Sequence, residues 1–131
     1  MNFFLDTAIC LDALAGRAPT LVKRLQGLTP SAIKIPAIVH AELLLAAEKS
    51  RRRERALPVV ERFLFPFEIV PFDARAAARH AALRLTLEPR ETGLRPHDLI
   101  VAATVLVHDA TLLTPAVRKF RKVPALRCEE P

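Results

Sequence analysis

The sequence lacks several residue types and patterns that would point to particular classes of protein. It has no tryptophan or tyrosine and only 7 phenylalanines, so it offers no aromatic ladder on which the bases of a single-stranded nucleic acid would stack. It has only 3 glycines, and 51% of its residues are hydrophobic, which excludes a disordered or low-complexity chain. With 131 residues, we expect a single domain spanning residues 1–131.

Long apolar runs are also missing. No segment approaches the roughly 20 apolar residues of a membrane-spanning helix, and no basic residues precede an apolar stretch at the N-terminus, as they would in a signal peptide. The two cysteines, Cys10 and Cys128, lie at opposite ends of the chain without the spacing of a metal site. We therefore expect a cytoplasmic protein with no membrane partner and with reduced thiols.

Charge is unevenly divided between the two signs. There are 20 lysines and arginines but 14 aspartates and glutamates, which gives a formal net charge of +6. A basic surface attracts polyanions, RNA or DNA above all, through the release of counterions. One basic run, at residues 51–55, is equally compatible with a solvated helix face. The charge indicates an affinity for phosphate in general and says nothing of base recognition.

Strands and helices are expected to alternate along the chain. The apolar run Phe3–Leu5 predicts a strand that is buried on both faces. Further strands are expected at 33–35, 67–70, 111–114 and 125–128, and helices at 8–15, 19–28, 37–49, 74–87 and 98–107. The basic stretch after Lys49 continues as helix towards Phe65, with a kink or a fresh start at Pro58, and residues 89–96 form a loop. This order predicts an α/β fold, a three-layer α/β/α sandwich with a central, mainly parallel sheet.

Three carboxylates interrupt segments that are otherwise apolar. Asp6 closes the first strand, Glu42 lies within the apolar face of the 37–49 helix, and Asp98 begins the most hydrophobic helix. A buried carboxylate needs a cation or several hydrogen-bond donors. Ligands of parallel sheets gather at the carboxyl ends of the strands, so Asp6 and Asp98 can face one rim. Three acids gathered there would hold Mg²⁺ or Mn²⁺, which prefer oxygen ligands.

Each acid also has a purely structural interpretation. Asp6 and Asp98 could cap or stabilise the first turn of the helices that follow them, and Glu42 could be a surface residue at the edge of an apolar stripe. The four histidines have no HxH or HxxxH spacing, so we interpret them as ordinary surface or core residues. The residues by themselves leave the metal site and the helix caps as alternatives.

A set of short segments in one order spans essentially the whole chain: Phe4–Thr7, Ala41–Leu44, Ala47–Ser50, Phe67–Asp73, Asp98–Ala103, Leu113–Thr114, Arg118–Phe120 and Val123–Leu126. Taken together, these segments resemble one known family, the PIN-domain ribonucleases, and specifically the VapC-type toxins of bacterial toxin–antitoxin modules. The resemblance implies a PIN-like sandwich and an endoribonuclease that uses Mg²⁺ or Mn²⁺ to cleave RNA. It further implies a homodimer and a cognate antitoxin protein as partners.

The resemblance also assigns roles to individual residues. It implies a catalytic site formed by Asp6, Glu42 and Asp98, of which Asp6 and Asp98 are the expected metal ligands. Thr7 and Thr114 correspond to hydroxyls that border such sites. The basic segment near the C-terminus contributes the expected RNA contacts, which are Arg118, Lys119 and Arg121.

The sequence departs from the family pattern at three positions. Ala8 stands where the family usually has asparagine, Ala116 where it has asparagine or aspartate, and Lys119 where glutamate is common. With fewer carboxylates, we expect one tightly held ion and either lower activity or a requirement for Mn²⁺. The alternative hypothesis is a catalytically weak PIN-like module that binds RNA or a partner protein without cutting. A phosphoacceptor domain is not favoured, because no second acid lies beside Asp6.

Overall fold

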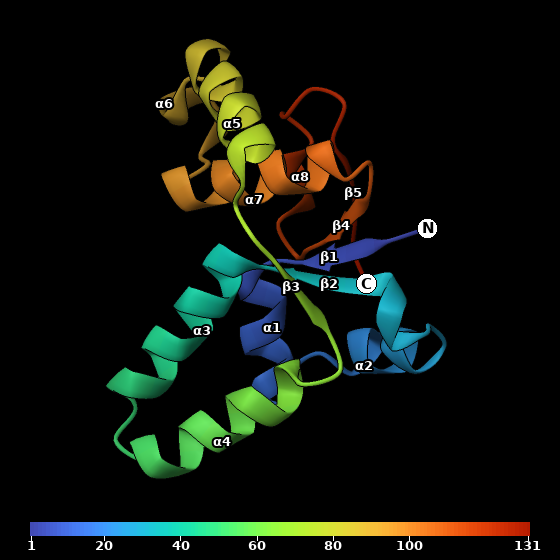
Figure 1. The fold of residues 1–131 in the computed structure, drawn as a ribbon, viewed down its shortest axis with the longest axis vertical. Coiled ribbons are helices and arrows are strands. Elements are labelled where there is room, and N and C mark those ends of the chain that lie inside the picture. The colour runs from blue at the N-terminus through green and yellow to red at the C-terminus, as the bar shows by residue number, and fades with distance from the viewer.

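The computed structural model describes all of residues 1–131 and has a five-stranded sheet at its centre (Figure 1). The strands are β1 (Phe3–Leu5), β2 (Ile33–Pro36), β3 (Glu68–Val70), β4 (Thr111–Leu113) and β5 (Arg127–Glu129). Their order in the sheet is β3-β2-β1-β4-β5, and every neighbouring pair is parallel. The first strand of the chain is therefore the central strand of the sheet.

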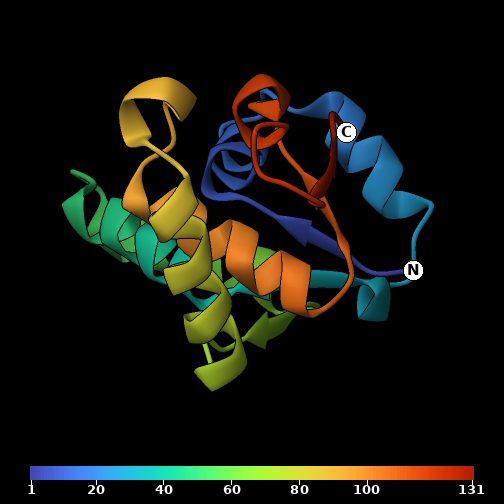
Figure 2. The same cartoon turned by 90° about the horizontal axis from the view of Figure 1, so that it is seen from above.

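Helices cover both faces of this sheet. They are α1 (Thr7–Leu14), α2 (Pro19–Gln26), α3 (Ala37–Lys49), α4 (Arg53–Leu64), α5 (Ala74–Thr86), α6 (Pro89–Thr92), α7 (Pro96–Val107) and α8 (Val117–Phe120). Figure 1 shows α1, α3 and α4 on one side of the strands, with α5 and α7 on the other. Seen from above, α5 lies against α7 (Figure 2). The predicted three-layer α/β/α sandwich with a parallel sheet is confirmed.

The core forms around β1 because helices cover it on both faces. All three of its residues are buried, and Phe4 has no exposed surface. In the neighbouring strands Ile33, Ile35 and Leu112 are equally inaccessible to solvent. A continuous apolar run suits this position, because neither face of a central parallel strand meets water.

Several boundaries differ from the sequence-based expectation. The interruption between the third and fourth helices falls at Ser50–Arg52 rather than at Pro58, which lies inside α4. Because α4 continues through the exposed Pro58, the expectation of a fresh start there was wrong. The predicted loop at 89–96 contains the short helix α6. The last strand begins two residues later than expected, after Ala125 adopts a left-handed conformation with φ of 66°.

Three smaller features complete the description of the fold. The carboxylate of Asp73 caps α5 by accepting a hydrogen bond from the backbone N–H of Ala76 at 3.0 Å. Cys10 and Cys128 are both free thiols. None of the helices combines the length and the apolar character needed to cross a membrane.

Replacing Phe4 by alanine should strongly destabilise the fold. The substitution leaves a cavity in the centre of the sheet, and losses for buried Phe→Ala are about 3–5 kcal/mol in the free energy of unfolding. Phe65→Ala is the matched control, because the Phe65 side chain is 89% exposed and its removal should change stability little. Urea unfolding of the two variants tests this, and equal midpoints would contradict the burial of β1.

Candidate active site

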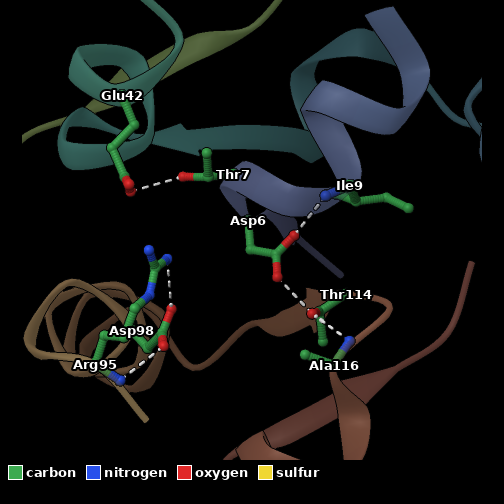
Figure 3. A network of polar contacts seen from close by, with 8 residues as sticks. All are labelled: Asp6, Thr7, Ile9, Glu42, Arg95, Asp98, Thr114 and Ala116. Carbon is green, nitrogen blue, oxygen red and sulfur yellow. Dashed lines mark hydrogen bonds and ion pairs between the residues drawn. The ribbon is translucent and has the colours of Figure 1, made fainter. Parts of the chain in front are cut away.

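Four elements bring polar side chains to the carboxyl edge of the sheet (Figure 3). Asp6 and Thr7 follow β1, Thr114 follows β4, Glu42 comes from α3, and Asp98 comes from the first turn of α7. Parallel strands end at the same edge, and their connections place the next helices beside it. The fold itself therefore explains why residues more than 100 positions apart meet here.

Asp6 lies at the junction between β1 and α1 and is buried. Its Oδ1 accepts a hydrogen bond from the backbone N–H of Ile9 at 2.8 Å, which makes Asp6 the N-cap of α1. Its Oδ2 accepts a hydrogen bond from the hydroxyl of Thr114. The structural interpretation as a helix cap thus holds for one carboxylate oxygen, while the other faces the β4 side of the site.

The pKa of Asp6 is raised from its ordinary value of 3.8 to about 6. Burial is the main cause, because it removes water from the charged form. The hydrogen bonds from Thr114 and Ile9 oppose the shift, whereas the negative charges of Asp98 and Asp12 add to it. Neither hydrogen-bond donor carries a charge. Asp6 is therefore a buried carboxylate without a cationic partner.

Thr114 fixes the orientation of Asp6. Its side chain is fully buried, and its hydroxyl oxygen also accepts a hydrogen bond from the backbone N–H of Ala116 at 2.9 Å. The hydroxyl also donates to Oδ2 of Asp6, because an ionised carboxylate can only accept a hydrogen bond. Thr114 thus fixes the Asp6 carboxylate without lining the pocket itself.

Thr7 and Glu42 connect α1 to α3. The Thr7 hydroxyl donates a hydrogen bond to Oε1 of Glu42 at 2.8 Å. Glu42 is half-buried, and the next residue, Leu43, belongs to the core. The interpretation of Glu42 as a simple surface residue does not fit this contact, because Thr7 holds the carboxylate next to the end of β1.

Asp98 is fixed by the residue that precedes α7. The backbone N–H of Arg95 donates to Oδ2 of Asp98 at 2.8 Å, and Nη2 of Arg95 lies 3.5 Å from Oδ1. The first contact is one half of a capping box, which stabilises the start of the helix. The Asp98 side chain is 21% exposed, so solvent reaches the carboxylate.

These side chains surround a pocket of about 190 Å³. It is lined by Asp6, Thr7, Ala8, Glu42, Arg95, Asp98, Val101, Ala116, Lys119 and Phe120. The structure thus brings all three predicted catalytic acids and Thr7 to one pocket, with Thr114 bonded to Asp6 behind it. Ala8 and Ala116 contribute only methyl groups at the positions where the family pattern has oxygen-bearing side chains.

The three predicted RNA-contacting residues do not share one environment. Lys119 lines the acidic pocket, while Arg118 and Arg121 are exposed and do not line it. Arg95 also lines the pocket and was missed by sequence reasoning. The signal that could have found it is local, because Arg95 precedes Pro96, the first residue of α7, and stands three residues before Asp98.

The oxygen donors in the pocket suit a hard divalent cation. The carboxylates surround the pocket without forming a closed cage, since no three His, Cys, Asp or Glu side chains are grouped closely enough to enclose an ion. Mg²⁺ commonly binds through one or two carboxylates and keeps several waters. Asp6, a buried carboxylate whose two hydrogen-bond donors are uncharged, and the solvent-reachable Asp98 would therefore fit such an ion with water in the remaining positions.

Comparison with known proteins agrees with this architecture. The family model described as the PIN domain matches residues 3–126. The chain belongs to the PIN-domain family. The match includes the first strand with Asp6, the helix with Glu42 and the first turn with Asp98.

Curated relatives place the chain in the VapC group of this family. It is 30% identical over 130 residues to the tRNA(fMet)-specific endonuclease VapC of Salmonella typhimurium, covering 99% of this chain and 98% of the relative. It is 31% identical over 130 residues to ribonuclease VapC2 of Rickettsia felis, covering 98% and 97% of the two chains. The resemblance to VapC-type ribonucleases is therefore confirmed over the full length of both proteins.

Solved structures share the same fold. A DNA-bound VapBC from Salmonella typhimurium matches with a TM-score of 0.91 and 30% identity, over 99% of this chain and 98% of the other. A toxin–antitoxin complex from Klebsiella pneumoniae matches with a TM-score of 0.72 and 26% identity, over 96% of this chain and 95% of the other. The three-layer arrangement is thus that of VapC structures.

Replacing Asp6 by asparagine should stabilise the metal-free protein at neutral pH. Because the folded-state pKa is raised above the unfolded one, the folded protein binds more protons between pH 4 and 6, and the contribution of Asp6 to stability falls as the pH rises through this window. The shift corresponds to up to about 3 kcal/mol at pH 7. The asparagine side chain retains an oxygen that can accept the Ile9 N–H.

Thermal unfolding of wild type and Asp6→Asn in EDTA, at pH values from 3.5 to 7.5, measures this effect. The two proteins should be nearly equally stable at the acid end, and the variant should gain steadily towards pH 7. Asp109→Asn serves as the control, because the Asp109 side chain is 92% exposed. A stability difference that does not change with pH would refute the assignment of a strained, ionised Asp6.

Proposed function

We propose that this chain is a divalent-metal-dependent endoribonuclease that hydrolyses RNA phosphodiester bonds at the pocket around Asp6, as the toxin of a toxin–antitoxin pair. The observation that carries the proposal is the buried Asp6 carboxylate. It has only uncharged donors, and Glu42 and Asp98 line the same solvent-open pocket. A fold that keeps such a carboxylate ionised without a cation loses stability, which a bound metal ion would restore.

Two of the acids are proposed to hold the ion directly. Asp6 is preoriented by Thr114 and Ile9, and Asp98 by the backbone N–H of Arg95. When bound, Mg²⁺ or Mn²⁺ supplies Lewis acidity for the attack of water on the phosphodiester and for the charge that develops there. Because these hydrogen bonds already fix both side chains, Asp6 and Asp98 would lose little conformational entropy when the ion binds.

Glu42 has a different proposed role. Its Oε1 accepts the Thr7 hydroxyl, which fixes the side chain, and its second oxygen can hydrogen-bond a water at the pocket. A half-buried carboxylate in this position can orient that water or accept its proton. Thr7 and Thr114 are proposed as positioning residues, because each donates its hydroxyl to one carboxylate.

RNA is the proposed substrate class. The net charge of +6 favours binding to a phosphate backbone, and Lys119 stands at the pocket itself. The Salmonella relative is a tRNA(fMet)-specific endonuclease, so tRNA(fMet) is the first RNA to test on this chain. Arg118 and Arg121 remain proposed contacts to the RNA outside the pocket.

A protein partner is proposed for an apolar groove away from the acids. The groove, of about 370 Å³, lies between α1, α3 and α4 and has eight hydrophobic residues in its lining, including Leu11, Leu14 and Val59. Solved relatives are toxin–antitoxin and VapBC complexes. We propose that the cognate antitoxin covers this groove and that the toxin itself is a homodimer.

Cleavage of RNA should depend on both metal and Asp98. Purified, antitoxin-free protein incubated with labelled tRNA(fMet) and total RNA is expected to give discrete cuts with Mg²⁺ or Mn²⁺ and none with EDTA. Asp98→Asn should lower the cleavage rate at least about 100-fold, since it removes a charged metal ligand. Asp109→Asn is the matched control and should cut like wild type, because an asparagine tolerates the φ of 50° at this position.

RNA that is bound but never cut, under any metal, would contradict the nuclease assignment. That result would favour the alternative of a binding module, for which the methyl groups of Ala8 and Ala116 in the pocket are the supporting observation. Cutting that survives EDTA and Asp98→Asn would point to a contaminating nuclease.

Val59→Glu should weaken the complex with the antitoxin encoded beside this chain. The glutamate would put a charge against an apolar surface that the partner is proposed to cover, and a tenfold or greater loss of affinity is expected. Val22→Glu is the control, because Val22 on α2 is similarly exposed, at 45% compared with 43% for Val59. Calorimetry and size-exclusion chromatography measure the affinity and the oligomeric state. Equal affinities for both variants would rule out this groove.

A further inference from the structure

Two basic side chains share the wall of the acidic pocket. Arg95 comes from the residue before α7, and Lys119 comes from α8. Both residues are exposed to solvent, so neither is committed to a buried ion pair. Cations beside a site built from carboxylates either neutralise those carboxylates or bind a second anion that enters the pocket.

Arg95 contacts the Asp98 carboxylate with both its backbone N–H and its guanidinium group. Its backbone N–H bonds to Oδ2 at 2.8 Å, and its guanidinium lies 3.5 Å from Oδ1. In Figure 3 the guanidinium extends from Asp98 towards the side of the pocket where Glu42 and Thr7 lie. The Arg95 side chain is 62% exposed, and exposed ion pairs are weak. The hydrogen bond from the backbone N–H of Arg95 is therefore the stable contact to Asp98, whereas the guanidinium can leave Asp98 and pair with another anion.

Lys119 has no carboxylate partner within the ion pairs of the structure. Its side chain runs past Gly93, where an added Cβ would lie 3.7 Å from Cε of the lysine. Gly93 ends α6 in a left-handed conformation with φ of 72° and stands two residues before Arg95. The lysine chain therefore lies beside the same turn that carries Arg95, and its ammonium group has three donors to offer.

The charges of the pocket fit one metal ion and one phosphate. Three carboxylates and two basic side chains leave one net negative charge among the lining residues. One divalent ion together with one phosphodiester group brings this charge to zero, whereas a second divalent ion would leave an excess of two positive charges. An uncompensated charge in a partly buried pocket is unfavourable.

We propose that Arg95 and Lys119 bind the scissile phosphate and supply the positive charge that a second metal ion would otherwise supply. This inference rests on the proposed nuclease function. In the metal-free protein the Arg95 guanidinium is the counter-ion of Asp98, and binding of the divalent ion displaces it. The released guanidinium then pairs with the phosphate oxygens, for which its fork of donors is well suited.

Binding measurements without catalysis test the exchange. Titration of the full chain with Mn²⁺, followed by calorimetry and electron paramagnetic resonance, is expected to give one tight ion per chain. Arg95→Ala should bind Mn²⁺ about two- to fivefold more tightly, because the competing cation is gone. The same substitution, made in a Glu42→Gln background that blocks cleavage and measured with Mn²⁺ present, should weaken the binding of labelled tRNA(fMet) about tenfold, because a charged hydrogen bond to phosphate is lost.

Opposite changes in metal and RNA affinity separate this role from a loss of folding, which would weaken both. Lys119→Ala should weaken RNA binding to a similar extent, and Arg95→Lys should recover part of it. Arg90→Ala is the control for net charge, because Arg90 on α6 is exposed and does not line the pocket. Two equally tight Mn²⁺ ions in wild type, or an Arg95→Ala or Lys119→Ala variant that matches Arg90→Ala, would overturn the proposal.

Asp98→Asn distinguishes this proposal from the one on which it rests. If Asp98→Asn binds Mn²⁺ as tightly as wild type, the metal site at Asp98 is wrong and both proposals fail. If Asp98→Asn loses Mn²⁺ but Arg95→Ala behaves like Arg90→Ala in both assays, the nuclease site stands and only the phosphate-binding role of Arg95 is lost.

Discussion

Five parallel strands end at one edge of the sheet, and the central strand is followed by the buried carboxylate of Asp6. Asp6 is held between β1 and β4 by one backbone N–H and one hydroxyl, neither of which carries charge. Helix α1 starts from its cap, and the pocket opens in front of it. Glu42 and Asp98 line the same pocket as this buried carboxylate, and their proposed roles depend on it.

The pocket keeps this anion under electrostatic strain. Burial and the neighbouring charges of Asp98 and Asp12 raise the pKa of Asp6, and the two hydrogen bonds only partly oppose them. An apolar residue at this position would be easier to bury, and the burial penalty of the carboxylate supports the proposal that Asp6 binds a cation. Under that proposal, stability and function favour different residues at position 6, as is common at functional sites.

The parts of the site that the sequence predicts are those encoded by local patterns. Asp6 could be identified because an apolar strand stops at it and a helix begins, and Asp98 because it opens a strongly apolar helix. Arg95 has a local signal as well, its place before Pro96, but its position at the pocket depends on the left-handed turn at Gly93 and on the packing of α8, which brings Lys119 to the same wall. The helix break expected at Pro58 does not occur, since at this exposed position water can hydrogen-bond the carbonyl that loses its backbone partner to the proline.

The contact between Thr114 and Asp6 joins residues that are 108 positions apart, and this has a consequence for protein synthesis. Long-range parallel pairing is slow to form, and here the pairing of β1 with β4 also waits for the translation of β4, at Thr111–Leu113. A ribosome-bound chain that has not reached Thr114 has no hydroxyl to orient Asp6 and no fourth strand beside β1. The order of strands thus delays assembly of the acidic pocket until β4 and Thr114 have been translated.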